Sequence, residues 1–468
     1  MTNILTILGT IASTALIVSY IQFLRRTGVI TLFHVTTCSI LVSNGIGLAF
    51  TQNTKIAEES GVTETSLGKA AVAILLFAAI MWGLSRLFYD SRSAPLARRN
   101  QSLSGRRFLM NPRALIATSF AMLLVALGAY RFLLVNGAIA YLGESFATSV
   151  GSASHYEVRA EISDEYLAAG RGAYAAGVAL FLICPVLIPL LIMCWLKCKR
   201  WVFLGCALAM CGVQLTLALV LGHRAPVLFC LLQPLVTWAL FRNAFSLGPL
   251  FRKWLAAVYI FIGVVFTTGG AMVFQLSDNT DFVDGVGRLY SRICIVPVTS
   301  SSFVFDLFPN TMPYRGILRC LDMADAAETG AGVNFGDIAL ASTGVRYDSN
   351  SYLVAVAYSG FGYVGVIAVS VLYFFYCYAI DRFVGRGGAE VRALAVSCSL
   401  YTLAAIGNVP FFTAVLNFGF GLTAVAAVWL YQLWFPVTEL YPRSTIPRVL
   451  GSGTREGAGR VVARKVGA

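Results

Sequence analysis

An arginine between two apolar runs is the residue of this chain best placed to do chemistry. Arg224 lies in a short turn between the apolar residues 201–221 and 227–241. The runs and the turn total about forty residues, and two membrane crossings need roughly that number at ~20 residues each. The turn therefore has little length with which to project into water. A guanidinium at that depth is costly to place, so Arg224 is a candidate functional residue.

The residues around Arg224 indicate an anion site. Pro226 suits the first turn of a helix that begins just after Arg224, and helix N-termini present free N–H groups that bind anions. Arginine adds a planar, bidentate phosphate donor, so we expect it to bind a phosphate that arrives in the membrane, such as a lipid pyrophosphate. The alternative is an arginine that snorkels to lipid headgroups. His223 is either a phosphate ligand or proton acceptor, or a polar turn residue.

A second set of charged residues lies in a long polar segment after residue 274. Its polar members recur at helical spacing and are Asp281, Asp284, Arg288 and Arg292. The apolar members on another face are Phe282, Val286, Leu289 and Ile293. This pattern predicts an amphipathic helix near the outer membrane interface. Arg288 and Arg292 are one turn apart and can bind one anionic group together. The alternative is a surface salt bridge between Asp284 and Arg288, which stabilises little.

Polar and aromatic residues before a later apolar run suit sugar binding. Amides and carboxylates reach hydroxyl groups, and aromatic faces cover the apolar side of a pyranose; the candidates are Asn334, Asn350 and Tyr352. Asp348 is the preferred base for activating an acceptor hydroxyl, and the alternative is an ordinary solvated carboxylate. Arg131 lies one turn before the end of an apolar run, so it either snorkels or faces the same cavity as Arg224.

The composition predicts the elements that must position these residues. The chain is 58% hydrophobic and 12% charged, with a mean hydropathy of +0.75, which is typical of an all-α polytopic integral membrane protein. The first span carries no basic region before it, so we expect a retained helix rather than a cleaved signal peptide. We predict eleven spans, at residues 3–24, 29–51, 70–89, 114–137, 173–196, 201–221, 226–241, 254–274, 353–379, 393–411 and 413–435.

Charged residues predict the orientation of these spans. Arginines and lysines gather on one side of the alternating spans and most acids on the other, which places the N-terminus outside and the C-terminus in the cytoplasm. We expect one membrane domain at 1–435, with a long outer loop at 275–352 between spans eight and nine, and a basic, disordered tail at 436–468. The net charge is +13, but most basic residues flank apolar runs and the sequence has no nucleic-acid-binding motif. Nucleic acid is therefore not an expected partner.

Several motifs are absent from the sequence. There is no P-loop, DxD pair, HExxH, GxSxG or Cys/His metal spacing, so we expect no ATP use, no metal and no other cofactor. Most cysteines lie inside apolar runs, where cysteine behaves as a small apolar residue. Cys294 and Cys320 share the long outer loop and are either a disulfide or two free thiols.

Three short motifs carry a resemblance to a known family. They are the turn Gly222-His223-Arg224, the pair Arg292 and Pro297, and the run Phe361-Gly362-Tyr363-Val364-Gly365. With the span layout, they make the chain similar to the Wzy-type O-antigen and polysaccharide repeat-unit polymerases, especially the enterobacterial common antigen polymerases. The family often has serine or threonine where this chain has His223, which leaves the role of that residue open.

The resemblance implies a glycosyltransferase of the bacterial inner membrane. Two polyprenyl-pyrophosphate-linked oligosaccharides would meet at its periplasmic face, and the growing glycan would move onto the new repeat unit without a metal. Arg224, Arg288 and Arg292 would hold the pyrophosphates. The expected partners of the protein are membrane lipids, with a chain-length regulator and a flippase as further candidates. An O-antigen ligase is the first alternative, but it favours a histidine in the loop 275–352, which has none. A lipid-linked oligosaccharide transporter would show repeated halves and a charged central cavity, and the sequence shows neither. A scaffold role stays open.

Overall fold

The structure is a bundle of apolar helices. A computed structural model describes the following residues: 2–27, 29–51, 62–89, 112–131, 178–220, 224–244, 263–264, 267–272, 281–310, 313–314, 353–385, 388–406, 411–416 and 419–435. These residues are almost entirely helical and include no strand. Among them, six helices are long and apolar enough to cross a membrane. The prediction of an all-α membrane protein is therefore confirmed.

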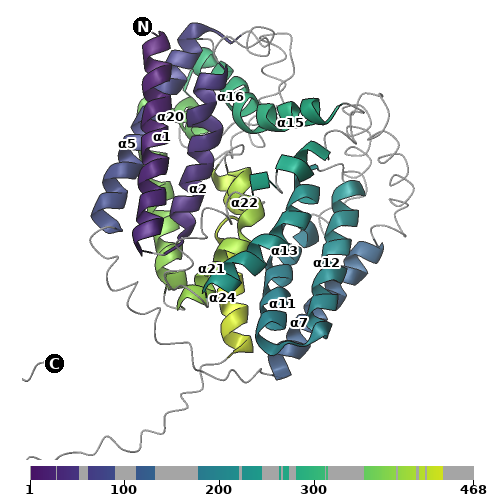
Figure 1. Cartoon of the computed structure of the whole chain (residues 1–468). Helices are drawn as coiled ribbons and strands as arrows, with labels where there is room; N and C mark the ends of the chain where they lie inside the picture. The colour runs from purple at the N-terminus through teal and green to yellow at the C-terminus, as the bar shows by residue number, and fades with distance from the viewer. Residues whose placement is uncertain are drawn as a thin grey trace, which may run out of the picture.

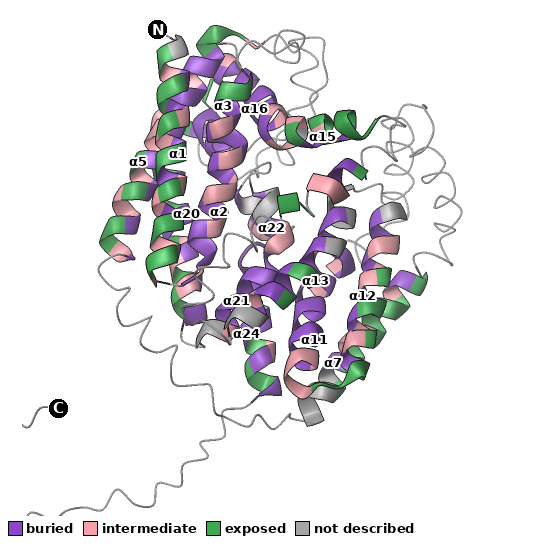
Figure 2. Ribbon diagram, in the orientation of Figure 1, coloured by how far each residue is buried: buried purple, intermediate pink, exposed green. Residues whose placement is uncertain are grey.

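The outer faces of several helices expose apolar side chains. These helices are α1 (Thr2–Thr27), α7 (Pro112–Tyr130) and α12 (Trp201–Val220). Val202 is 72% exposed and Ile116 is 69% exposed, and Figure 2 shows long exposed stretches on all three helices. Water would disfavour so extensive an apolar surface, whereas apolar lipid tails do not. A helix also suits lipid because it satisfies its own backbone hydrogen bonds.

One group of helices contains the N-terminus. Its members are α1, α2 (Leu32–Ile40), η1 (Leu41–Ile46), α3 (Gly47–Thr51), α5 (Glu64–Phe88), α16 (Val296–Leu307) and α20 (Leu353–Gly385). The Tyr20 hydroxyl donates to the Met81 carbonyl, and a Cβ on Gly9 would touch Ala71, so α1 and α5 run parallel. The backbone N–H of Leu32 donates to Asp381 near the end of α20. Helix α2 therefore runs opposite to α20.

A second group of helices packs beside the first (Figure 1). Its members are η5 (Ala179–Ile183), α11 (Cys184–Cys198), α7, α12, α13 (Arg224–Ala244), α21 (Gly388–Cys398), α22 (Leu400–Ala405), α23 (Phe411–Leu416) and α24 (Leu422–Trp434). The buried Gln233 amide donates to the carbonyls of Pro185 and Ser397, which ties α13 to α11 and α21. Helix α20 packs on both α21 and α24, and one apolar core runs through both groups.

The two ends of the bundle differ in charge. We call the end at which α1 begins the upper end, as drawn in Figure 1, and the opposite end the lower end. The contacts between helices place α15 (Phe282–Tyr290) and the first turns of α5 and α13 at the upper end. Basic residues gather at the lower end, in or beside the last turns of α1, α5, α11 and α20; they are Arg25, Arg26, Arg86, Lys197, Lys199, Arg200 and Arg382.

Three predicted spans are interrupted in the structure. The span predicted at 353–379 is broken, because Phe361 and Gly362 have non-helical backbone angles inside α20. The span predicted at 393–411 is interrupted at Ser399, between α21 and α22. The span predicted at 413–435 is also interrupted, since Gly419 and Gly421 adopt positive φ angles of 66° and 77° and separate α23 from α24. Apolar runs predict length well, but they carry no signal for such breaks.

The break in α20 gives a testable prediction. Gly362 has φ +63° and ψ −144°, a region open to glycine alone, and a Cβ there would lie 2.8 Å from the Tyr314 hydroxyl. We expect Gly362→Ala to lower the free energy of unfolding by about 1–3 kcal/mol. Thermal unfolding in detergent measures this loss. Gly83→Ala is the matched control, because nothing lies within 4 Å of a Cβ at Gly83 in α5. An equal unfolding midpoint for both variants would contradict the prediction.

Candidate functional site

The candidate arginine of the central turn opens a helix. Helix α13 begins at Arg224, two residues before Pro226, so the arginine is the first helical residue and does not precede the helix as we predicted. The difference has a local cause, because proline is accepted anywhere in a first turn, where N–H groups lack helical partners. The structure describes the backbone of Arg224 and not its side chain. The free N–H groups of this turn, which bind anions, lie at the upper end of the bundle.

A short helical segment packs against both the start of α13 and α15. Residues 267–272 contact α13 at Leu228, which a Cβ on Gly269 would approach within 3.3 Å. The same segment contacts α15, where a Cβ on Gly270 would lie 2.5 Å from Leu289 and one on Gly285 would lie 2.6 Å from the Ala271 carbonyl oxygen. Gly270 and Gly285 therefore allow the segment 267–272 and α15 to approach closely. The segment 267–272 thus lies between the first turns of α13 and α15.

The helix predicted across 281–292 is present, and it packs through a narrow face. Helix α15 buries Gly285 and Leu289, while Phe282 stays 43% exposed and Val283 78% exposed. The Tyr290 hydroxyl lies 3.1 Å from the Thr267 hydroxyl and fixes the end of α15 to the same segment. Arg288 is exposed on this helix, which crosses the upper end of the bundle in Figure 1.

Arg292 lies in a π-helical turn. The turn η6 (Ser291–Ile295) separates α15 from α16 and packs on α3 and on η1, which is itself π-helical. A Cβ on Gly47 would lie 2.2 Å from the Cys294 carbonyl oxygen, so glycine is needed at this contact. Single π-helical turns occur frequently at functional sites. The side chain of Arg292 is not described, but its backbone lies one turn beyond Arg288.

The remaining candidates are only partly described. Arg131 is exposed at the end of α7, which packs on α12, α24 and η5 in the group that contains α13. Cys294 is a free, buried thiol, and Cys320 lies outside the described residues. Also outside them lie His223, Asn334, Asp348, Asn350, Tyr352 and the tail 436–468.

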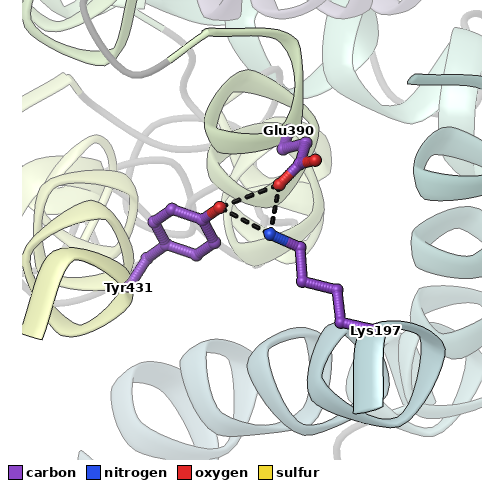
Figure 3. A network of polar contacts seen from close by, with 3 residues as sticks. All are labelled: Lys197, Glu390 and Tyr431. Atoms are coloured by element: carbon purple, nitrogen blue, oxygen red, sulfur yellow. Dashed lines mark hydrogen bonds and ion pairs between the residues drawn. The ribbon is translucent and has the colours of Figure 1, made fainter. Parts of the chain in front are cut away.

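A buried ion pair at the lower end was missed in the sequence. The Lys197 ammonium contacts the Glu390 carboxylate, and it donates to the Tyr431 hydroxyl at 2.7 Å (Figure 3). The Tyr431 hydroxyl donates in turn to Glu390 at 2.8 Å. The side chains of Lys197 and Glu390 are only 7% and 13% exposed. Lys197 resembled the other basic residues at the ends of spans, and nothing in the sequence distinguishes it from them.

A second buried carboxylate lies at the lower end in the other group of helices. Asp381 accepts hydrogen bonds from the N–H groups of Leu32 and Phe33, at 2.6 and 3.0 Å, and from the Tyr89 hydroxyl at 2.7 Å. It therefore caps the N-terminus of α2, where negative charge is favourable. Arg392, in the first turns of α21, is close enough to Asp381 for their charges to interact. Both clusters join neighbouring helices at the lower end of the bundle.

Within the described ranges, no group of three or more histidine, cysteine, aspartate or glutamate side chains is placed to hold a metal ion. The described charged side chains of the upper end include Arg288, Lys69 and the separate carboxylates of Asp281, Asp284 and Asp306. Such a set can bind and stabilise phosphate oxygens through hydrogen bonds and charge.

Comparison with known proteins adds no identification. No protein-family model, no curated protein and no solved structure matches this chain. The fold and the exposed apolar helices define it as an α-helical, multi-pass membrane-embedded protein.

Proposed function

We propose that the chain is a membrane-embedded glycosyltransferase that joins polyprenyl-pyrophosphate-linked oligosaccharides into a surface polysaccharide. One observation carries the proposal: the helix that opens at Arg224 and the helix of Arg288 are joined through residues 267–272. Two arginine-bearing helices, about sixty residues apart in sequence, thus pack on one shared segment at the same end of the bundle. The proposed reaction needs cations beside two lipid pyrophosphates at a membrane boundary, and this is the role we propose for Arg224 and Arg288.

The direction of the helices supports an orientation in the membrane. Described basic residues gather at the lower end, which would be the cytoplasmic end by the positive-inside rule. The upper end, with α15 and the start of α13, would then face the periplasm of a bacterial cell across its inner membrane. The proposed topology would have eleven spans, with the N-terminus outside and a long outer loop at 275–352 between spans eight and nine.

The proposed reaction transfers a glycan from one pyrophosphate to an acceptor hydroxyl. The bond between the anomeric carbon and the pyrophosphate oxygen breaks, and a new bond forms to the acceptor oxygen. A base takes the proton of that hydroxyl, and Asp348 is the candidate. Polyprenyl pyrophosphate leaves with the bonding electrons, and Arg224 with Arg292 would stabilise the charge that develops on it. The reaction needs neither a redox step nor a cofactor.

Deleting the gene is the first test of this function. We expect cells without the protein to carry surface glycan capped with single repeat units, because repeats would still be made and exported but not joined. Electrophoresis of the extracted surface glycan measures chain length, and a plasmid copy of the gene should restore the long chains. Normal long chains in the deletion strain would rule out the polymerase proposal.

A transporter of lipid-linked oligosaccharide is the second candidate, and the break in α20 favours it. Broken helices with buried halves are common in transporters, and Leu353–Gly360 is buried throughout. Purified protein in sealed vesicles separates the two functions. A polymerase yields a ladder of lengthening products from lipid-linked repeats, whereas a transporter moves the repeats across the bilayer without lengthening them.

A further inference from the structure

We propose that a cluster of tyrosines at the break in α20 binds the sugar portion of the substrate. We call it the tyrosine patch and define it as Tyr314, Tyr358 and Tyr363, beside Phe361 and Gly362. The inference rests on the proposed function and assigns a saccharide site within it. The motif around Gly362 was identified in the sequence without a role, and the structure shows what it builds.

The break in α20 creates the space for this patch. Because Gly362 has no side chain, the Tyr314 hydroxyl lies over it, 2.8 Å from the position a Cβ would take. A Cβ on Gly365 would lie 2.1 Å from the Ala357 carbonyl oxygen, so the second glycine lets the two halves of the helix fold against each other. Both glycines of the motif are therefore required by the bend that seats Tyr314.

The aromatic rings of the patch pack together and differ in their exposure to solvent. The Tyr358 ring lies 4.7 Å from Phe305, 5.1 Å from Tyr363 and 6.0 Å from Tyr314, measured between ring centroids. Tyr358 is buried and anchors the cluster, whereas Tyr314 is 42% exposed and Phe361 47% exposed. Supported but half-exposed rings present an apolar face with a polar hydroxyl edge, which suits a ligand of the same mixed character.

Polar groups surround these rings at the same corner of the molecule. The Lys69 ammonium donates to the Phe305 carbonyl at 2.8 Å, and the Tyr363 hydroxyl reaches the Lys69 carbonyl at 3.5 Å. Asp306 accepts a hydrogen bond from the Thr63 hydroxyl at 2.9 Å. A half-buried ammonium, a carboxylate and hydroxyls can bind the hydroxyls of a sugar, and the aromatic faces beside them can cover its C–H face.

The position of the patch relative to the arginines fits a lipid-linked oligosaccharide. Both lie at the upper end, connected by the helical run of α15, η6 and α16 (Figure 1). From Arg288 to Phe305 this run is at most about 25 Å long at 1.5 Å per residue. A pyrophosphate held near Arg288 would thus leave room for several sugars before the chain reaches Tyr314.

The test measures sugar binding without catalysis. The probe is the water-soluble oligosaccharide that mild acid releases from the lipid-linked fraction of the cells that make this protein. We expect saturation-transfer NMR to show contact between this oligosaccharide and the purified full-length protein. Tyr314→Ala should weaken binding at least about tenfold, because a half-exposed ring loses its whole contact area. Phe361→Ala is a second variant with the same expected direction, and it tests the site if Tyr314→Ala does not fold.

The matched control is Phe383→Ala, which removes a 37% exposed aromatic ring at the lower end of the same helix. Its affinity for the oligosaccharide should equal that of the wild type. Absence of binding by the wild type, or equal binding by all three variants, would overturn the site. These results do not depend on chain growth, so loss of the ladder of products with intact sugar binding would count against the polymerase and not against the patch.

Discussion

Arg224→Ala should abolish lengthening of lipid-linked repeats while the protein remains in the membrane. Arg224 opens α13 at the upper end, and the proposed chemistry develops negative charge on a departing pyrophosphate. Removing one preorganised donor to such a charge lowers the rate by about a hundredfold or more. The measurement is the rate of ladder formation by purified protein incubated with lipid-linked repeats. Immunoblotting of the membrane fraction reports whether the variant is made and inserted.

Two further variants make the Arg224 test specific. Arg224→Lys should restore little activity, because lysine keeps the charge but not the planar pair of donors that binds two phosphate oxygens. Arg382→Ala removes an exposed arginine near the lower end of α20 and should leave the ladder unchanged. Full activity in Arg224→Ala would refute the role in pyrophosphate binding. Full activity in Arg224→Lys would show that charge alone is sufficient.

Lys197→Met should destabilise the protein strongly without touching the upper end. The substitution leaves the Glu390 carboxylate buried, with Tyr431 as its one remaining partner in the network of Figure 3. Breaking a buried ion pair by removing one member costs about 3–5 kcal/mol, since the other charge stays desolvated. The expected result is a clearly lower midpoint of thermal unfolding in detergent.

The double variant Lys197→Met/Glu390→Gln separates lost charge pairing from lost packing. Removing both charges should recover much of the stability, because neither member is then left buried and charged. Arg200→Met is the control, as it deletes an exposed cation three residues further along the chain and should shift the midpoint little. A midpoint for Lys197→Met equal to that of Arg200→Met would show that the buried network does not stabilise the bundle.

The two predictions draw on opposite kinds of information. Arg224 was identified in the sequence, because a charged residue between two apolar runs contrasts with its surroundings. Lys197 and Glu390 were not, because both follow or precede apolar runs as ordinary boundary residues do. Whether such a residue faces water or a partner depends on which helices lie beside it, and here Glu390 reaches Lys197 across nearly two hundred positions of sequence. The Asp381 cap on α2 was missed for the same reason.

The sequence by itself determined that the chain is helical and membrane-embedded, because lipid admits only long apolar segments that satisfy their own backbone hydrogen bonds. It also determined that a helix would start near Arg224 and that another would carry Arg288. The tertiary structure alone decided that the segment 267–272 packs on both helices, with Gly270 and Gly285 allowing its close approach to α15, and that Gly362 bends α20 to seat Tyr314. Close backbone approach depends on which surfaces meet, and apolar patterning along one chain does not encode that pairing.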